Sequence, residues 1–210
     1  ATPADANRAL PPGGRIGRII AICFVATTHL FALGMPQKDP KPARPDPVAT
    51  QCHDLVRHLP NVNAALCRDA ALTPGPARSV QGRALLIRDL PAPDARMRVL
   101  VVGGIHGDEL SSSSVALHWL RLAESGGFAL PQAGHWRFIP ALNPDGLIRQ
   151  PPRRVNANGV DLNRNFPTPR WEREAPQYWE RRTGKDPRRW PGPKPLSEPE
   201  SRYLHDEMTR

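Results

Sequence analysis

The sequence predicts a domain of the α/β class, because segments typical of strands alternate along the chain with a segment typical of a helix. Residues 84–87 form a short apolar run, and residues 98–102 (RVLVV) form a β-branched run that predicts a buried strand. Residues 111–123 carry apolar positions at helical spacing. Residues 136–142 (WRFIPAL) predict a further strand, which ends at the turn sequence of residues 143–146 (NPDG).

The segments on either side of this core are less regular. Residues 51–71 predict one or two short helices interrupted by Pro60. Residues 170–195 are rich in Pro, Arg and Trp without a clean period, which predicts an irregular loop. A last helix is expected to begin at Ser197, with Glu200 three residues later completing a capping box.

The first 50 residues predict a leader and a linker. Within the leader, residues 1–35, an apolar stretch at residues 19–33 follows two arginines in the order of an export signal, with an uncleaved membrane anchor as the alternative. Residues 36–50 are rich in proline and predict an extended linker, which leaves residues 51–210 as the folded unit. We therefore expect a periplasmic or otherwise exported protein, or one anchored in the inner membrane, that contacts a membrane only through its N-terminal segment.

Composition adds expectations about partners and compartment. The formal net charge of +9 comes from arginines spread along the sequence, so no nucleic-acid partner is expected. Of the three cysteines, Cys23 lies in the leader, which leaves Cys52 and Cys67 as the pair in the remaining chain. An exported protein could oxidise this pair to a disulfide, and two unrelated buried thiols are the alternative.

A histidine and a glutamate lie three residues apart just after the strand predicted at residues 98–102. His106 and Glu109 follow two glycines, which allow the backbone to turn sharply at a strand end. An imidazole and a carboxylate placed there can converge on one cation, and zinc accepts both kinds of ligand. The spacing also suits a helical turn with a surface His and Glu, and two ligands do not complete a catalytic zinc site.

Residues 153–167 (RRVNANGVDLNRNFP) gather amide and guanidinium side chains in a short loop. Such groups are costly to fold around unless they bind one another or a polar ligand. The planar fork of Arg164 suits a carboxylate, and Asn163 adds donors for the same group. A turn rich in asparagine with solvated arginines is the alternative.

Three blocks in this order and spacing resemble the zinc carboxypeptidase family, and most of all its bacterial murein peptide amidase branch: HGDE at residues 106–109, NPDG at 143–146 and NANGVDLNRNFP at 156–167. The resemblance covers residues 98–204, the first half of the family's catalytic domain. It implies a carboxypeptidase-like (phosphorylase/hydrolase-like) mixed sheet flanked by helices, of which this chain holds the N-terminal part.

The resemblance also implies roles for individual residues. His106 and Glu109 match the first two ligands of Zn²⁺. Arg154 matches the arginine that polarises the scissile carbonyl and stabilises the oxyanion, with Arg153 as its rival by one position. The pair that grips the substrate's terminal carboxylate matches Asn163 and Arg164.

The family's third zinc ligand and its general base are expected beyond Arg210, so residues 51–210 are interpreted as a partial domain. His205 lies within the last helix and is interpreted as a surface residue. The glutamates of the same helix are interpreted as its cap and solvated face: Glu198, Glu200 and Glu207.

The implied activity is zinc-dependent hydrolysis of the peptide bond next to a free C-terminal carboxylate, with murein peptides as the expected substrate class. A small-molecule N-acyl amino acid deacylase of the same fold is one alternative, and a truncated remnant without catalysis is another. With two zinc ligands and no general base, the 210-residue chain alone is expected to be inactive.

Overall fold

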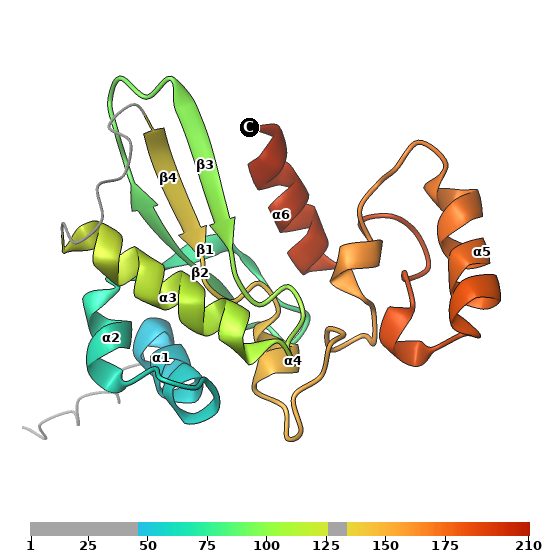
Figure 1. Ribbon diagram of the computed structural model, residues 1–210, viewed down its shortest axis with the longest axis horizontal. Helices are drawn as coiled ribbons and strands as arrows, with labels where there is room; N and C mark the ends of the chain where they lie inside the picture. The colour runs from blue at the N-terminus through green and yellow to red at the C-terminus, as the bar shows by residue number, and fades with distance from the viewer. Residues whose placement is uncertain (1–45, 126–133) are drawn as a thin grey trace, which may run out of the picture. The chain divides into compact units, whose positions relative to one another are not determined.

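A four-stranded mixed sheet lies at the centre of the computed structural model, which describes residues 46–125 and 134–210 (Figure 1). The strand order is β1-β2-β4-β3, with antiparallel pairing of β2 to both β1 and β4 and parallel pairing of β3 to β4. The strands are β1 (Thr73–Arg78), β2 (Ala84–Leu90), β3 (Met97–Val102) and β4 (Gly134–Ile139). The expected α/β fold with a mixed sheet is therefore confirmed.

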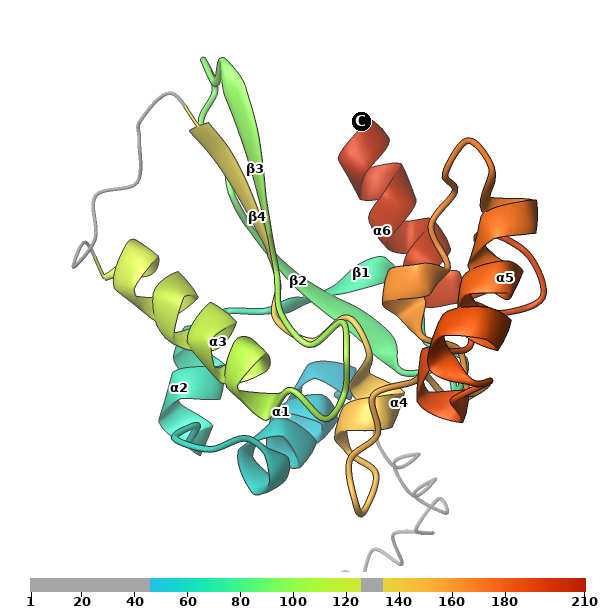
Figure 2. The ribbon, with the colours of Figure 1, turned by 45° about the vertical axis from the view of Figure 1, so that its right-hand side comes forward.

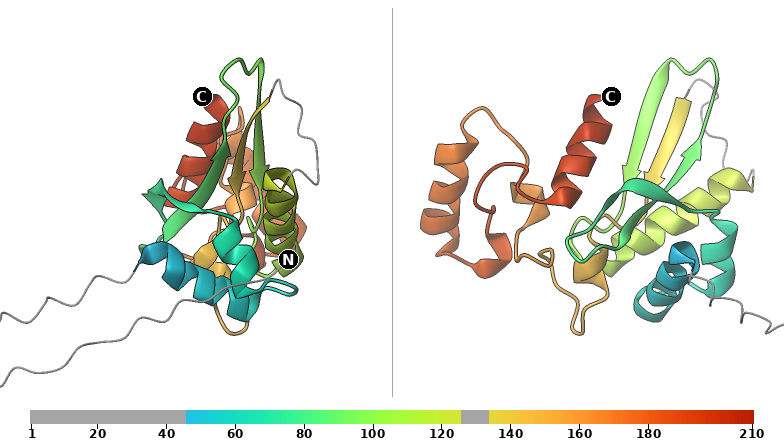
Figure 3. Two further views of the ribbon diagram at one scale, coloured as in Figure 1. Left: turned by 90° about the vertical axis from the view of Figure 1, so that its left-hand side faces the viewer. Right: turned by 180° about the vertical axis from the view of Figure 1, so that it is seen from behind.

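Helices cover both faces of the sheet. α3 (Leu110–Glu124) and α6 (Pro199–Thr209) lie on opposite faces (Figures 2 and 3). The alternation along β2 accounts for the two cores, because Ala84 and Leu86 pack into the core that includes α3, whereas Leu85 and Ile87 pack with Tyr203 and Leu204 of α6. Across the part of the chain that the structure describes, no helix is long and apolar enough to cross a membrane.

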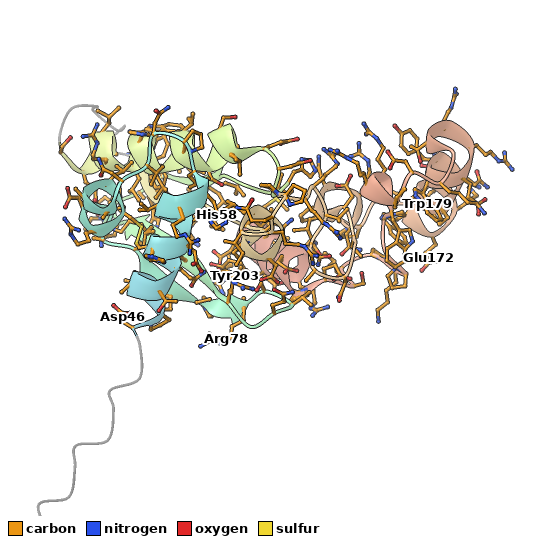
Figure 4. The ribbon with its side chains drawn as sticks, turned by 90° about the horizontal axis from the view of Figure 1, so that it is seen from below. Asp46, His58, Arg78, Glu172, Trp179 and Tyr203 are labelled. Atoms are coloured by element: carbon orange, nitrogen blue, oxygen red, sulfur yellow. A yellow bond between two sulfur atoms is a disulfide. The ribbon has the colours of Figure 1, made fainter. Side chains whose placement is uncertain are left out.

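Two short helices, α1 (Pro47–His58) and α2 (Ala64–Asp69), precede the sheet and pack into the same core as α3. Asp46 caps α1, and Figure 4 shows Asp46 and His58 at its two ends. The helix begins within the segment expected to be an extended linker, because a proline is tolerated in the first helical turn, where its missing N–H is not needed. The rest of that segment and the predicted leader lie outside the described residues.

The disulfide predicted between Cys52 and Cys67 is confirmed. It joins α1 to α2 with the two Cα atoms 5.7 Å apart. Both cysteines are buried in the core that α1 and α2 share with the sheet. The bridge therefore ties α1 and α2 to each other within that core.

The outer strands of the sheet differ from the sequence-based expectation. β1 is not predicted, because Pro74 and Pro76 are unfavourable in a strand, but β1 is an edge strand, where proline is tolerated. β3 lies at the opposite edge of the described sheet and is exposed or half-buried rather than fully buried. β4 ends at Ile139, immediately before Pro140.

Residues 170–195, expected to be an irregular loop, contain α5 (Trp171–Thr183) and the 3-10 helix η2 (Pro187–Arg189). α5 lies beyond the 3-10 helix η1 (Leu162–Arg164) and α6 from the sheet (Figures 1 and 2). Of its residues only Trp171 is buried, so α5 has no apolar face that a sequence pattern would reveal. The expectation of a loop was wrong for this reason.

The last helix, α6, begins two residues later than expected and has no capping box. Its N-cap is Glu198, and neither Glu198 nor Ser197 makes a capping hydrogen bond to the helix. Glu200 is fully buried, and its carboxylate accepts hydrogen bonds from Val80 N–H and the Asn156 amide. Glu198 is buried too, and the Glu207 side chain is buried in an ion pair with Arg137. The interpretation of these glutamates as a cap and a solvated face was therefore wrong.

Candidate active site

The carboxyl ends of the parallel strands β3 and β4 bring two loops together. After β3, Gly103 N–H donates to Ile139 O, and its own carbonyl accepts from Leu142 N–H at 3.0 Å. Asn143 N–H donates to Gly104 O at 2.8 Å, and Gly104 has a φ of +59°, which favours glycine. The loop that carries His106 is thus bonded directly to the loop after β4, which runs into α4 (Pro144–Leu147).

The segment that carries Arg154 packs closely on these loops. The Arg154 carbonyl accepts hydrogen bonds from Gly107 N–H at 3.3 Å and from the Asn143 side-chain amide at 3.2 Å. A Cβ atom on Gly107 would lie closer than 3.0 Å to backbone atoms of Gly146, Leu147 and Arg153. Glycine at position 107 therefore lets the backbone of Arg154 lie against the loop between His106 and Glu109.

Four side chains form one polar cluster at this junction. His106 is buried, with 5% of its surface exposed, and its Nδ1 lies 2.9 Å from Glu109 Oε1. Its Nε2 lies 3.1 Å from Asp161 Oδ1 on the opposite side of the ring. Arg154 joins the two carboxylates, because its Nε donates to Asp161 Oδ2 at 3.0 Å and its Nη1 to Glu109 Oε1 at 3.3 Å. Three predicted site residues thus meet within hydrogen-bonding distance.

Asp161 is the member of the cluster that sequence reasoning missed. It is fully buried, and its Oδ1 also accepts from Asn163 N–H at 3.1 Å, which caps η1. Burial would raise the pKa of the Asp161 carboxyl, but the hydrogen bond with His106 and the Arg154 guanidinium outweigh it and hold that pKa below its ordinary value. An acidic residue inside the amide-rich block of residues 153–167 was the signal that could have identified it.

The structure distinguishes the two neighbouring arginines. The Arg154 side chain is 13% exposed and bonded within the cluster, whereas Arg153 is exposed. This geometry favours Arg154 as the arginine of the site.

Asn163 and Arg164 lie on η1, next to Asp161 but outside the cluster. The Arg164 guanidinium lies 5.9 Å from the centre of the Tyr178 ring, and its Nη1 donates to Asn163 O at 3.0 Å. Trp171 Nε1 donates to Arg164 O at 2.7 Å, which ties η1 to the first turn of α5. The Asn163 side chain is exposed to solvent.

The donor set suits zinc at the face of His106 that carries Nδ1. A nitrogen and an oxygen bound tetrahedrally at about 2.1 Å would lie about 3.4 Å apart. The separation of 2.9 Å between His106 Nδ1 and Glu109 Oε1 needs only a small opening to admit the ion. Within residues 46–125 and 134–210 no group of three His, Cys, Asp or Glu side chains could hold a metal ion. Asp161 does not add a third ligand beside Glu109, because it contacts Nε2 of His106 and not Nδ1.

Comparison with known proteins agrees with this arrangement. The chain is 39% identical over 135 residues to murein peptide amidase A of Escherichia coli (strain K12), an alignment that covers 61% of this chain and 52% of that protein. The chain therefore spans about half the length of this curated relative.

Two solved structures share the fold. The structure of bovine thrombin-activatable fibrinolysis inhibitor superposes with a TM-score of 0.54 at 20% identity, covering 77% of this chain and 53% of that one. Carboxypeptidase A from Helicoverpa armigera gives a TM-score of 0.55 at 20% identity, covering 69% and 40%. The sequence profile described as zinc carboxypeptidase matches residues 75–210, and this chain accordingly belongs to the zinc carboxypeptidase family.

Proposed function

We propose that this chain supplies two zinc ligands, the oxyanion arginine and the carboxylate-binding pair of a hydrolase that cleaves the peptide bond next to a free C-terminal carboxylate, with murein peptides as the substrate class. The observation that carries the proposal is the position of His106, whose Nδ1 faces Glu109 while its Nε2 is held by Asp161. A resemblance in sequence to a murein peptide amidase supports the substrate class.

His106 and Glu109 would hold the metal ion. When bound there, zinc would polarise the substrate carbonyl and lower the pKa of a water molecule. The ligand atom Nδ1 must be unprotonated, and Asp161, as a hydrogen-bond acceptor at Nε2, favours the tautomer that leaves Nδ1 free to bind. Asp161 therefore acts on the metal site through the orientation and tautomer of His106.

Arg154 is suited to stabilise the negative charge that develops on the scissile carbonyl oxygen. A guanidinium has five N–H donors, and the bonds to Asp161 and Glu109 use one on Nε and one on Nη1. The remaining donors can bind an oxyanion, and the largely buried position of the side chain strengthens that interaction.

Asn163 and Arg164 would bind the terminal carboxylate of the substrate. The planar guanidinium of Arg164 can make two parallel hydrogen bonds to a carboxylate, and the exposed Asn163 amide adds a further donor beside it. Because η1 follows directly from Asp161, this pair has a fixed relation to His106 and Arg154.

An exported location is part of the same proposal. The buried disulfide between Cys52 and Cys67 supports it, because such bonds persist in oxidising compartments such as the bacterial periplasm. The predicted signal in residues 19–33 supports it independently.

The experiment that tests this function is release of the C-terminal residue from a murein tripeptide, with zinc and with a chelator. We expect a hydrolase that contains this chain to show zinc-dependent release that His106→Ala and Glu109→Ala abolish, whereas the 210-residue chain alone is expected to be inactive. The matched control is His205→Ala, since His205 lies on α6 and is not part of the cluster. Hydrolysis of N-acyl amino acids but not of the tripeptide would favour the deacylase instead, and release that survives His106→Ala would overturn the assignment.

A further inference from the structure

A pocket beside Arg154 has a basic lining. Arg153, Arg154 and Arg188 lie around it with a single carboxylate, Asp108, so these charged side chains carry a formal charge of +2. The pocket shares Arg154 with the candidate active site, and arginine side chains gathered in this way are suited to bind an anionic group.

The backbone of Arg153 is fixed, although its side chain is exposed. Arg153 N–H donates to Gly146 O at 2.9 Å. Its carbonyl oxygen packs so closely on Gly107 and Gly146 that a Cβ at either glycine would lie closer than 3.0 Å to it. The Arg153 guanidinium therefore projects from a rigid position next to Arg154.

Arg188 reaches the same pocket from η2, more than 30 residues further along the chain. Its N–H donates to Asp186 Oδ1 at 2.9 Å, which caps η2. Its Nη2 donates to Asp108 Oδ2 at 2.7 Å, and Asp108 lies between His106 and Glu109 in the sequence. Arg188 is thus held against the loop that carries both proposed metal ligands.

We propose that Arg153 and Arg188 form a second anion-binding subsite, which takes a carboxylate side chain of the substrate residue on the acyl side of the scissile bond. This inference rests on the proposed function. Arg154 marks the scissile carbonyl in that proposal, and Asn163 and Arg164 take the terminal carboxylate on the leaving-group side. The pocket adjoins Arg154 but is not lined by Asn163 or Arg164. The pocket is therefore assigned to the acyl side of the scissile bond.

A purely structural role accounts less well for this arrangement. The Arg188 side chain is 64% exposed, and an exposed ion pair contributes little to stability. The bond to Asp108 uses one of five guanidinium donors, so the others can bind a substrate carboxylate without breaking it. Recognition by Arg153 and Arg188 would select acidic peptides over neutral ones of the same shape.

The test compares two tripeptides that differ only in carrying Glu or Gln on the acyl side of the scissile bond. We expect wild-type protein to have the lower KM for the Glu peptide, and Arg153→Gln and Arg188→Gln each to reduce this preference about 10-fold with little change in kcat. Arg188→Lys should retain part of the preference for the Glu peptide. Arg182→Gln, which removes one exposed charge from α5, is the matched control and should leave the preference unchanged.

Binding of the same peptides, followed by NMR titration of the zinc-loaded protein, separates this inference from the proposed function. Preferential binding of the Glu peptide that depends on Arg188, without hydrolysis of either peptide by a hydrolase that contains this chain, would support the subsite and contradict the peptidase. Hydrolysis of both peptides with equal KM in wild-type protein would overturn the subsite and leave the peptidase standing. An equal loss for both peptides in Arg188→Gln would also overturn it, because that is the result expected of a structural tether.

Discussion

Removing the disulfide between Cys52 and Cys67 should destabilise the domain by an amount that follows from the length of the loop it closes. The two cysteines are 15 residues apart in sequence. In the chain-entropy account a loop of this length is worth about 3 kcal/mol at 25 °C. Both cysteines are buried in the core that α1 and α2 share with α3 and the sheet, so replacing each with alanine adds a further loss from reduced packing. We therefore expect the Cys52→Ala, Cys67→Ala variant to unfold with a free energy at least about 3 kcal/mol lower than wild type.

Urea denaturation followed by far-UV circular dichroism, without reductant, measures this difference. On the 210-residue chain with its predicted leader retained, Cys23→Ala is the matched control, because it removes a cysteine but keeps the bridge, and it should unfold like wild type. Thiol titration of the denatured wild-type chain should find one free thiol among its three cysteines. Three free thiols, or a difference below about 1 kcal/mol between the double variant and the control, would refute the reasoning.

Three further perturbations test the site and the core. Asp161→Asn should weaken zinc binding about 10- to 100-fold in a chelator competition, because the carboxylate that orients the His106 ring is lost. An unchanged zinc affinity would contradict this role of Asp161. Gly107→Ala should lower the free energy of unfolding in urea by about 1–3 kcal/mol, since its Cβ would meet the Gly146–Leu147 peptide and the Arg153 carbonyl; wild-type stability would show that the loops can separate. Burial raises the pKa of the Glu200 carboxyl in the folded protein. At pH values between the pKa in the unfolded chain, about 4.3, and this raised pKa, the native state holds a proton that the unfolded chain has lost. Stability should therefore fall as pH rises through that window, and Glu200→Gln should flatten this pH dependence of the melting temperature. The same pH dependence in wild type and Glu200→Gln would count against the burial of a protonated Glu200.

The elements predicted correctly are those whose side-chain pattern matches their packing. β2, β4 and α3 carry apolar residues at the spacing that their buried faces require, and β3 packs against the two cores through residues that are only partly buried. α5 could not be found in this way, because it is mostly exposed and contains Pro176. β1 could not be found because its edge position, which tolerates Pro74 and Pro76, is a property of the assembled sheet.

The candidate site was predictable in its residues but not in its connections. The sequence indicated His106, Glu109 and Arg154, and the structure brings their side chains together. It did not indicate that Asp161 bonds to both His106 and Arg154. The bond to His106 joins residues far apart in the chain, and the bond to Arg154 depends on how the intervening loop folds.

The burial of Glu200 was missed for a related reason. Helical spacing reports which residues share a face, but not which polar groups cover that face. Here the covering groups are Asn156 and the backbone of Val80, both distant in sequence from α6.

Zinc affinity of matched histidine variants tests the central claim most directly. Competition with a chromophoric chelator would be measured for wild type, His106→Ala, Glu109→Ala and the control His205→Ala. We expect zinc binding to be unchanged in His205→Ala and to fall below detection in His106→Ala and Glu109→Ala, because each of the latter removes one of the two ligands that face each other at 2.9 Å. Zinc bound with wild-type affinity by His106→Ala would contradict the assignment of the metal site.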